Sequence, residues 1–271
     1  MIRNDWSLDP VVLAGAAVAL ALYVQALVRL RRRGRTSDAS VAKGLLFAAG
    51  VAAGTLAVVS PLDALAEDTL LSAHMAQHLL IGDLAPLLIV LGLRGPISFF
   101  LLPPAPLRAV ARVGPLRRLL SFLLRPAVSF AVWAGSLAAW HVPQAYDAAL
   151  AHPALHVVEH ATLFLGGLLL WTQIVDPARR SHLGPGRRAA LGAAALLCGM
   201  VLCETLLAAG PLYGHYGRIA DRPFGLTWAS DQTRAALLMM AEQIATLGAA
   251  VALLVRAHVE QAEAETARPR S

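Results

Sequence analysis

Two pairs of histidines lie inside apolar stretches of the sequence. His74 and His78 belong to SAHMAQHLLIGDLAP within the apolar run 69–93, and His156 and His160 belong to HVVEH within the run 153–175. Both pairs have a spacing of four residues, so the two side chains of each pair share one helix face, about 6 Å apart in height. Neutral imidazole is a good ligand for copper, zinc, iron and nickel. The two pairs therefore predict a metal site.

The composition indicates that these histidines lie in a membrane protein. Of the 271 residues, 57% are hydrophobic and only 15% are charged, whereas a soluble domain has about 25% charged residues. Seven apolar segments approach or exceed the ~20 residues that span a bilayer. They lie near residues 10–30, 42–60, 69–93, 126–143, 153–175, 189–209 and 231–256. The predicted fold is a single all-α, polytopic domain of seven transmembrane helices, followed by a tail at 257–271.

The basic residues predict how this domain is oriented. Lys and Arg gather in 29–43, 94–125, 176–188 and the tail, whereas the alternate connections hold few. The positive-inside rule then places the N-terminus outside and the C-terminus in the cytoplasm. The net charge of +6 comes from these short connections, and no nucleic-acid-binding motif is present, so we expect a lipid bilayer and no nucleic acid as partner.

With this orientation, both histidine pairs lie near the outer ends of their helices. His141, at the end of the segment 126–143, lies at the same level, so we expect five imidazoles to form the metal site. Only His182 and His258 map to the cytoplasmic side. Thioethers of Met75, Met239 and Met240 at a similar depth would favour Cu(I), although a single methionine in such a helix is more often a core-packing residue.

Several polar residues are expected near these histidines or deeper in the membrane. Asp231 either caps the last helix or joins the metal site, and Glu159 either faces solvent or orients a ligand on another helix. Two carboxyl groups near the middle of the membrane are expected to be protonated, to pair with Gln77 or Gln243, or to belong to a proton or ion path. The residues concerned are Asp83 and Glu242. The acidic residues of the outer connections are expected at the surface, namely Asp63, Glu67, Asp68 and Asp147.

Two other metal chemistries are compatible with the same residues. HVVEH matches the H-x-x-E-H signature of zinc peptidases, with Glu159 as general base and His141 or Asp231 as third ligand. A membrane haem protein is the other alternative, although two histidines only about 6 Å apart on each helix are too close to hold two stacked haems. Cys198 and Cys203 lie in one apolar run and predict no disulfide framework.

Five sequence blocks also resemble one family. SAHMAQHLL, APLLIVLG, WHVPQAYDAAL, HVVEHATLFLGGLLLW and DQTRAALLMM, in this order over residues 40–256, resemble the CtaG family of bacterial cytochrome c oxidase assembly factors. The resemblance implies a non-enzymatic protein of the bacterial cytoplasmic membrane that delivers or inserts copper and contacts oxidase subunits. It also implies that the five histidines form the metal site, with Asp231 and Gln232 beside it. A scaffold that holds oxidase subunits without metal is the non-catalytic alternative, and a homo-oligomer is compatible with either.

Overall fold

The computed structural model describes residues 6–35, 38–179 and 183–267, and every regular element in these ranges is a helix. The all-helical class predicted from the sequence is confirmed for this part of the chain. The predicted cytoplasmic position of His182 and the last four residues of the predicted tail lie outside the described residues.

Six helices are long and apolar enough to cross a membrane. They are α1 (Pro10–Arg32), α2 (Val41–Val59), the unit from α4 (Leu71–Leu79) to α5 (Ala85–Gly92), α11 (Pro153–Val175), α12 (Pro185–Ala208), and the unit from α14 (Trp228–Gln243) to α15 (Ala249–Thr266). A seventh span is present if α8 (Gly114–Leu123) and α9 (Pro126–Trp140), which meet at an angle of 76°, are taken as one broken span.

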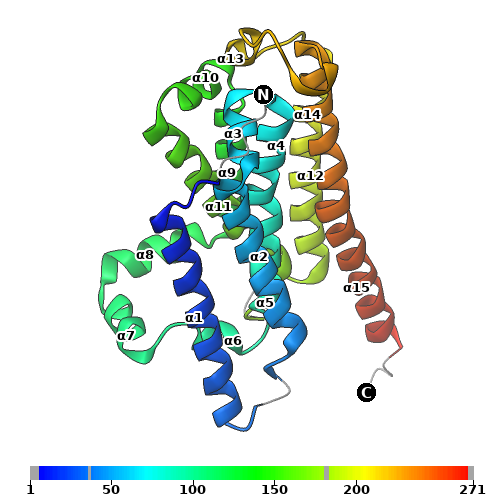
Figure 1. Ribbon diagram of the computed structural model, residues 1–271. Helices are drawn as coiled ribbons and strands as arrows, with labels where there is room; N and C mark the ends of the chain where they lie inside the picture. The colour runs from blue at the N-terminus through cyan, green and yellow to red at the C-terminus, as the bar shows by residue number, and fades with distance from the viewer. Residues whose placement is uncertain (1–5, 36–37, 180–182, 268–271) are drawn as a thin grey trace.

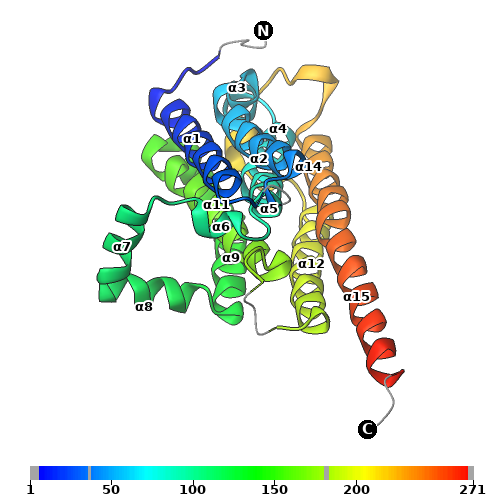
Figure 2. The same cartoon turned by 90° about the horizontal axis from the view of Figure 1, so that it is seen from below.

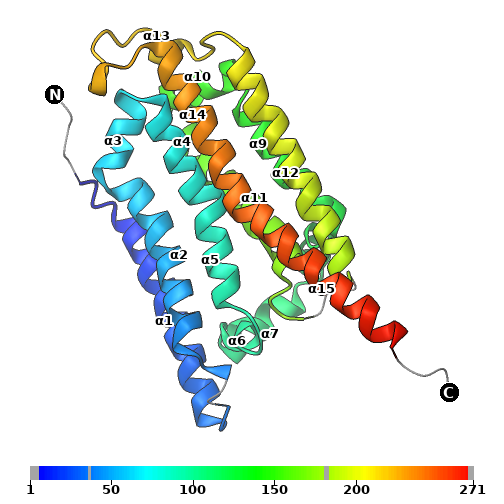
Figure 3. The same cartoon turned by 90° about the vertical axis from the view of Figure 1, so that its right-hand side faces the viewer.

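Short helices close the two ends of this bundle (Figures 1 and 3). At one end lie α3 (Pro61–Asp68), α10 (Pro143–Ala151) and α13 (Gly214–Gly217), and a single 3-10 turn forms at Pro223–Gly225. This is the end that the basic residues predict to be outside. At the other end lie α6 (Ile97–Phe100) and α7 (Pro104–Arg112).

The fourth and the last predicted spans have different lengths in the structure. Helix α9 has 15 residues, about 22 Å of helix, and it ends at Trp140 because Pro143 starts α10 in a new direction. The last helix begins earlier than predicted, at Trp228, and α15 continues to Thr266 beyond the other helices (Figure 3).

Helices α7 and α8 stand away from the bundle (Figure 2). Apolar side chains of these two helices are exposed, among them Leu107, Leu119 and Phe122, and basic residues share the same helices. This arrangement suits helices that lie in the plane of a membrane surface.

Two membrane helices contain a wider, π-helical turn. Leu80–Leu84 joins α4 to α5, and Ile244–Gly248 joins α14 to α15. Pro86 lies at the start of α5, just after the first segment. It has no N–H to donate to the carbonyl of Gly82 four residues before it, so the series of α-helical hydrogen bonds is broken at this point. Asp83 lies inside the first π segment, and Glu242 comes two residues before the second.

Glycines bring the helices that carry the histidines into close contact. A Cβ atom at Gly167 of α11 would lie 1.9 Å from the carbonyl oxygen of Gly82, so only glycine fits between these two backbones. Small residues at helix contacts permit this approach in membranes, where packing rather than the hydrophobic effect holds helices together. The contact sets α11 directly against the π segment that follows α4 and so brings the two histidine pairs together.

Candidate metal centre

The two histidine pairs meet between α4 and α11. One ring nitrogen from each of His74, His78, His156 and His160 lies within 4.8 Å of the other three, and we refer to these residues as the His quartet. His74 is fully buried, His78 and His156 are buried, and His160 is partly exposed. The four nitrogens converge on one point, an arrangement suited to a single ion rather than to a macrocycle.

Tyr216 of α13 fixes the tautomer of His74. The Tyr216 hydroxyl donates a hydrogen bond to the carbonyl oxygen of Ala66 at 2.6 Å, and its oxygen lies 2.8 Å from Nδ1 of His74. Burial raises the pKa of Tyr216 well above its ordinary value, so the hydroxyl keeps its proton. His74 must then donate through Nδ1–H, which leaves the lone pair on Nε2, the atom that faces the other histidines.

Glu67 of α3 does the same for His156. Nδ1 of His156 lies 2.8 Å from Oε1 of Glu67, and a carboxylate accepts, so Nδ1 carries a proton; in the neutral imidazole, the form that binds a metal, Nε2 then holds the lone pair. Such carboxylate–histidine contacts are typical of metal sites, where they set the tautomer and the ring orientation. The hydrogen bond from His156 holds the pKa of Glu67 below its ordinary value. Glu67 was expected only at the surface, and although its side chain is 43% exposed, its carboxylate belongs to this site.

The two oriented lone pairs face each other. Nε2 of His74 and Nε2 of His156 are 3.4 Å apart, and two lone pairs at this distance repel unless a cation or a proton lies between them. This contact is the observation that best fits a bound cation.

Glu159 places a carboxylate beside the quartet. It is fully buried, and its two oxygens lie 3.6 Å from Nε2 of His78 and 4.0 Å from Nε2 of His156. The sequence allows Glu159 either to face solvent or to lie beside a ligand on another helix. In the structure it is buried beside His78 of α4.

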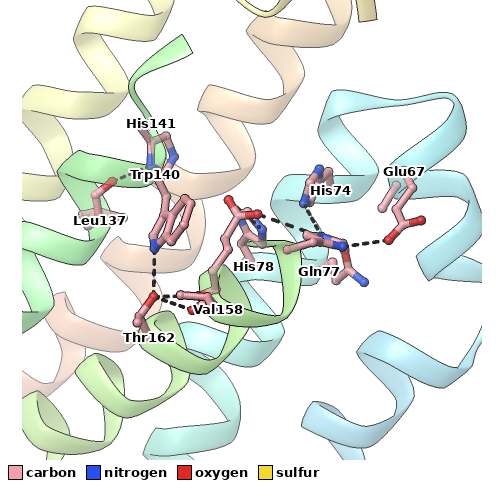
Figure 4. Close-up of polar contacts among 12 residues, drawn as sticks. Glu67, His74, Gln77, His78, Leu137, Trp140, His141, Val158 and Thr162 are labelled. Atoms are coloured by element: carbon pink, nitrogen blue, oxygen red, sulfur yellow. Dashed lines mark hydrogen bonds and ion pairs between the residues drawn. The ribbon is translucent and has the colours of Figure 1, made fainter. Parts of the chain in front are cut away.

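His141 does not join the quartet. Its Nδ1 lies 2.8 Å from the carbonyl oxygen of Leu137 in its own helix, and its Nε2 is buried without a hydrogen-bond partner. Figure 4 shows His141 beside Leu137 and Trp140, separate from His74 and His78. His141 instead lines a small cavity that has His78 on its wall.

Asp231 caps a helix other than its own. Thr227 and Ser230 form the capping box of α14, whereas the Asp231 carboxylate accepts hydrogen bonds from the backbone N–H of Leu71 at 2.8 Å and from the N–H and hydroxyl of Ser72. The expectation that Asp231 caps the last helix is therefore wrong. Its carboxylate holds the N-terminus of α4, the helix that carries His74.

The two glutamines expected near the site are also structural clamps. Gln232 accepts from the N–H of Leu212 at 2.8 Å and donates to two carbonyl groups, one in the last turn of α12 and one just after it. Gln77 donates to the carbonyl of Ala57 at 2.9 Å and to the carboxylate of Asp63 at 2.6 Å. Neither side chain reaches the quartet through these contacts, but both hold the elements around it.

The expected thioether ligands lie on the far side of His78. Met75 and Met239 are buried in a core cluster with Tyr146 and Cys203, and both line the small cavity that His141 also lines. Met240 packs at the edge of the same cluster.

A larger cavity leads to the quartet from the side. It has a volume of about 700 Å³ and lies between α1, α2 and α11. His156 and His160 form part of its wall, and Asp9, Asp63 and Glu67 add acidic groups to it. The quartet is therefore reached through an opening whose carboxylates attract cations.

The sequence was also compared with known proteins. Among the curated proteins and the solved structures compared, none matches this chain. One family matches, that of the cytochrome c oxidase caa3 assembly factor (Caa3_CtaG), over residues 21–260. The match includes both histidine pairs, His141 and the Asp231–Gln232 pair, and on its extent this chain belongs to the cytochrome c oxidase caa3 assembly factor family.

Proposed function

We propose that this protein binds Cu(I) at the His quartet and supplies it to subunits of the oxidase during assembly in the bacterial cytoplasmic membrane. Membership of an oxidase assembly family supports the pathway, and four converging imidazole nitrogens support a copper-binding centre. The observation that carries the proposal is the pair of Nε2 atoms, 3.4 Å apart, that Tyr216 and Glu67 orient toward one another.

The geometry favours holding a metal over hydrolysis. Catalytic zinc sites keep three protein ligands and leave a position for water, whereas closed sites use four. The quartet supplies four nitrogens, with a carboxylate beside them.

Copper binding by purified protein tests the proposal. Wild type, the double variant His74→Ala/His78→Ala and the control His258→Ala, which changes a histidine at the other end of the bundle, are titrated with Cu(I) under reducing conditions. We expect one Cu(I) per chain in wild type and control and none in the double variant. Equal binding by all three proteins would refute a site at the quartet.

A second experiment separates copper supply from the alternatives. In cells whose own gene is deleted, the double variant should fail to restore oxidase activity, and added copper should rescue it partly. A scaffold without metal predicts full restoration by the double variant. The buried carboxylate of Glu159 is the feature that favours a zinc hydrolase. That alternative predicts stoichiometric zinc and a hydrolytic activity that Glu159→Gln abolishes. A haem protein would be coloured when purified.

A further inference from the structure

A small cavity lies deeper in the membrane than the quartet. It has a volume of about 50 Å³, and its polar wall consists of His78, Asp83, His141, Glu242 and Gln243. The remaining wall is apolar, and among the described residues that line it there is no lysine or arginine. Three membrane helices and the end of α9 contribute to it.

Several polar atoms around this cavity have no hydrogen-bond partner among the described residues. Nε2 of His141, Oδ2 of Asp83, Oε1 of Gln243 and both carboxyl oxygens of Glu242 are buried without a hydrogen bond. A buried polar atom that is left without a hydrogen bond destabilises the protein unless water satisfies it. A water molecule needs about 10–15 Å³ of such volume and two or more polar partners, so this cavity accommodates water that links these groups.

Two carboxyl groups meet at this cavity. Oδ1 of Asp83 accepts a hydrogen bond from the indole N–H of Trp171 at 2.6 Å, and the carboxyl of Glu242 lies on the wall of the same cavity, whose volume is only about 50 Å³. Two adjacent carboxylates without a cation cannot both stay charged in a medium of low dielectric constant, so such a pair keeps one proton. Because Oδ1 of Asp83 already accepts the indole hydrogen bond, the shared proton is held between Oδ2 of Asp83 and the Glu242 carboxyl.

The backbone around this pair is specialised. The π segments Leu80–Leu84 and Ile244–Gly248 contain or adjoin the two acids, and π turns are frequent at functional sites. The side-chain amide of the neighbouring Gln243 packs directly against Gly199 of α12, where a Cβ atom would have to displace it.

We propose that Asp83 and Glu242 form a proton-binding site in the membrane interior, which water in the cavity links to His78, and that a cation bound at the His quartet displaces the shared proton. The proton site stands on the carboxyl pair alone, whereas its displacement by a cation rests on the proposed function. In balance, one cation enters the quartet and one proton leaves the carboxyl pair. The other titratable groups facing the cavity are His78 from α4 and His141 from the end of α9.

Infrared spectroscopy of metal-free protein in nanodiscs tests the proton site. The C=O stretch of a neutral carboxylic acid absorbs at a different frequency from the bands of a carboxylate. Wild type at neutral pH should therefore show an acid band, and this band should shift in heavy water. Glu242→Gln should remove this band, Asp83→Asn and Glu242→Asp should shift it, and the exposed control Glu260→Gln should leave it unchanged. The proposal is overturned if the spectra of Glu242→Gln and Asp83→Asn are the same as that of wild type. If one of the three variants at Asp83 and Glu242 does not fold, the remaining two decide.

Addition of Cu(I) to the same sample tests the displacement. We expect the acid band to disappear as one equivalent binds, with release of a proton that Glu242→Gln does not release. If copper binds and the band persists, the link between the sites is refuted. If copper does not bind, the proposed function fails, and the metal-free spectra still decide whether the carboxyl pair holds a proton.

Discussion

Replacement of Glu67 tests whether the second contact of a histidine controls metal affinity in this site. The Glu67 carboxylate accepts from Nδ1–H of His156 at 2.8 Å. Glu67→Gln keeps an oxygen acceptor but removes the charge, and hydrogen bonds to charged groups are about twice as strong as neutral ones. Loss of such contacts to a ligand costs roughly 10–100-fold in metal affinity. Since the side chain is 43% exposed and solvent screens part of its charge, we expect the lower value, about tenfold or ~1.4 kcal/mol.

Competition with a colorimetric Cu(I) chelator of known affinity measures this change in detergent solution. Glu67→Ala removes the acceptor altogether and should weaken binding by roughly 100-fold, more than Glu67→Gln, while Glu260→Gln serves as the matched control far from the site. The stoichiometry should stay at one Cu(I) per chain, because the four nitrogens remain. Wild-type affinity in both Glu67 variants would refute the reasoning that the carboxylate orients His156 for the metal.

Three further predictions concern the framework of the site. Asp231→Ala leaves the N-terminus of α4 uncapped and should destabilise the protein by about 2 kcal/mol, seen as a lower melting temperature in detergent, whereas Asp231→Asn should retain most of the stability. Gly167→Ala forces two backbones apart and should cost about 1–3 kcal/mol; Gly135→Ala, where a Cβ atom meets nothing within 4 Å, should melt as wild type does. A membrane-impermeant thiol reagent should label His152→Cys but not Glu260→Cys in intact cells, and the reverse pattern would invert the predicted orientation.

Much of the His quartet could be predicted from local sequence. The spacing of four puts each histidine pair on one helix face, and apolar runs of sufficient length put both pairs into membrane helices. The alternating distribution of basic residues then assigns both pairs to the same end of the bundle. These signals depend only on residues close together in the chain, whereas the close approach of α4 and α11 that joins the two pairs depends on the contact of Gly167 with Gly82.

The rest of the site could not be predicted because it depends on how the helices are rotated and paired. Both its depth and the family resemblance predict His141 at the metal site, but depth fixes only its height, and in the structure His141 lines the small cavity instead. Tyr216 orients the His74 ring but lies 142 residues away from it in the sequence. Glu67 orients the His156 ring and belongs to a separate short helix before α4. Asp231 had the chemistry of a cap, but its partner helix begins 160 residues earlier.

The π segments also bear on how sequences of this kind should be aligned. A π turn accommodates one residue more than an α turn, so the helix beyond it is rotated by about 100° relative to an uninterrupted helix. The face that α4 presents is therefore out of phase with the face that α5 presents, and the same holds for α14 and α15. A homologous helix without the wide turn would keep the same faces only if it were one residue shorter at that place. A single-residue gap at 80–84 or 244–248 would thus be a structural signature rather than an alignment error.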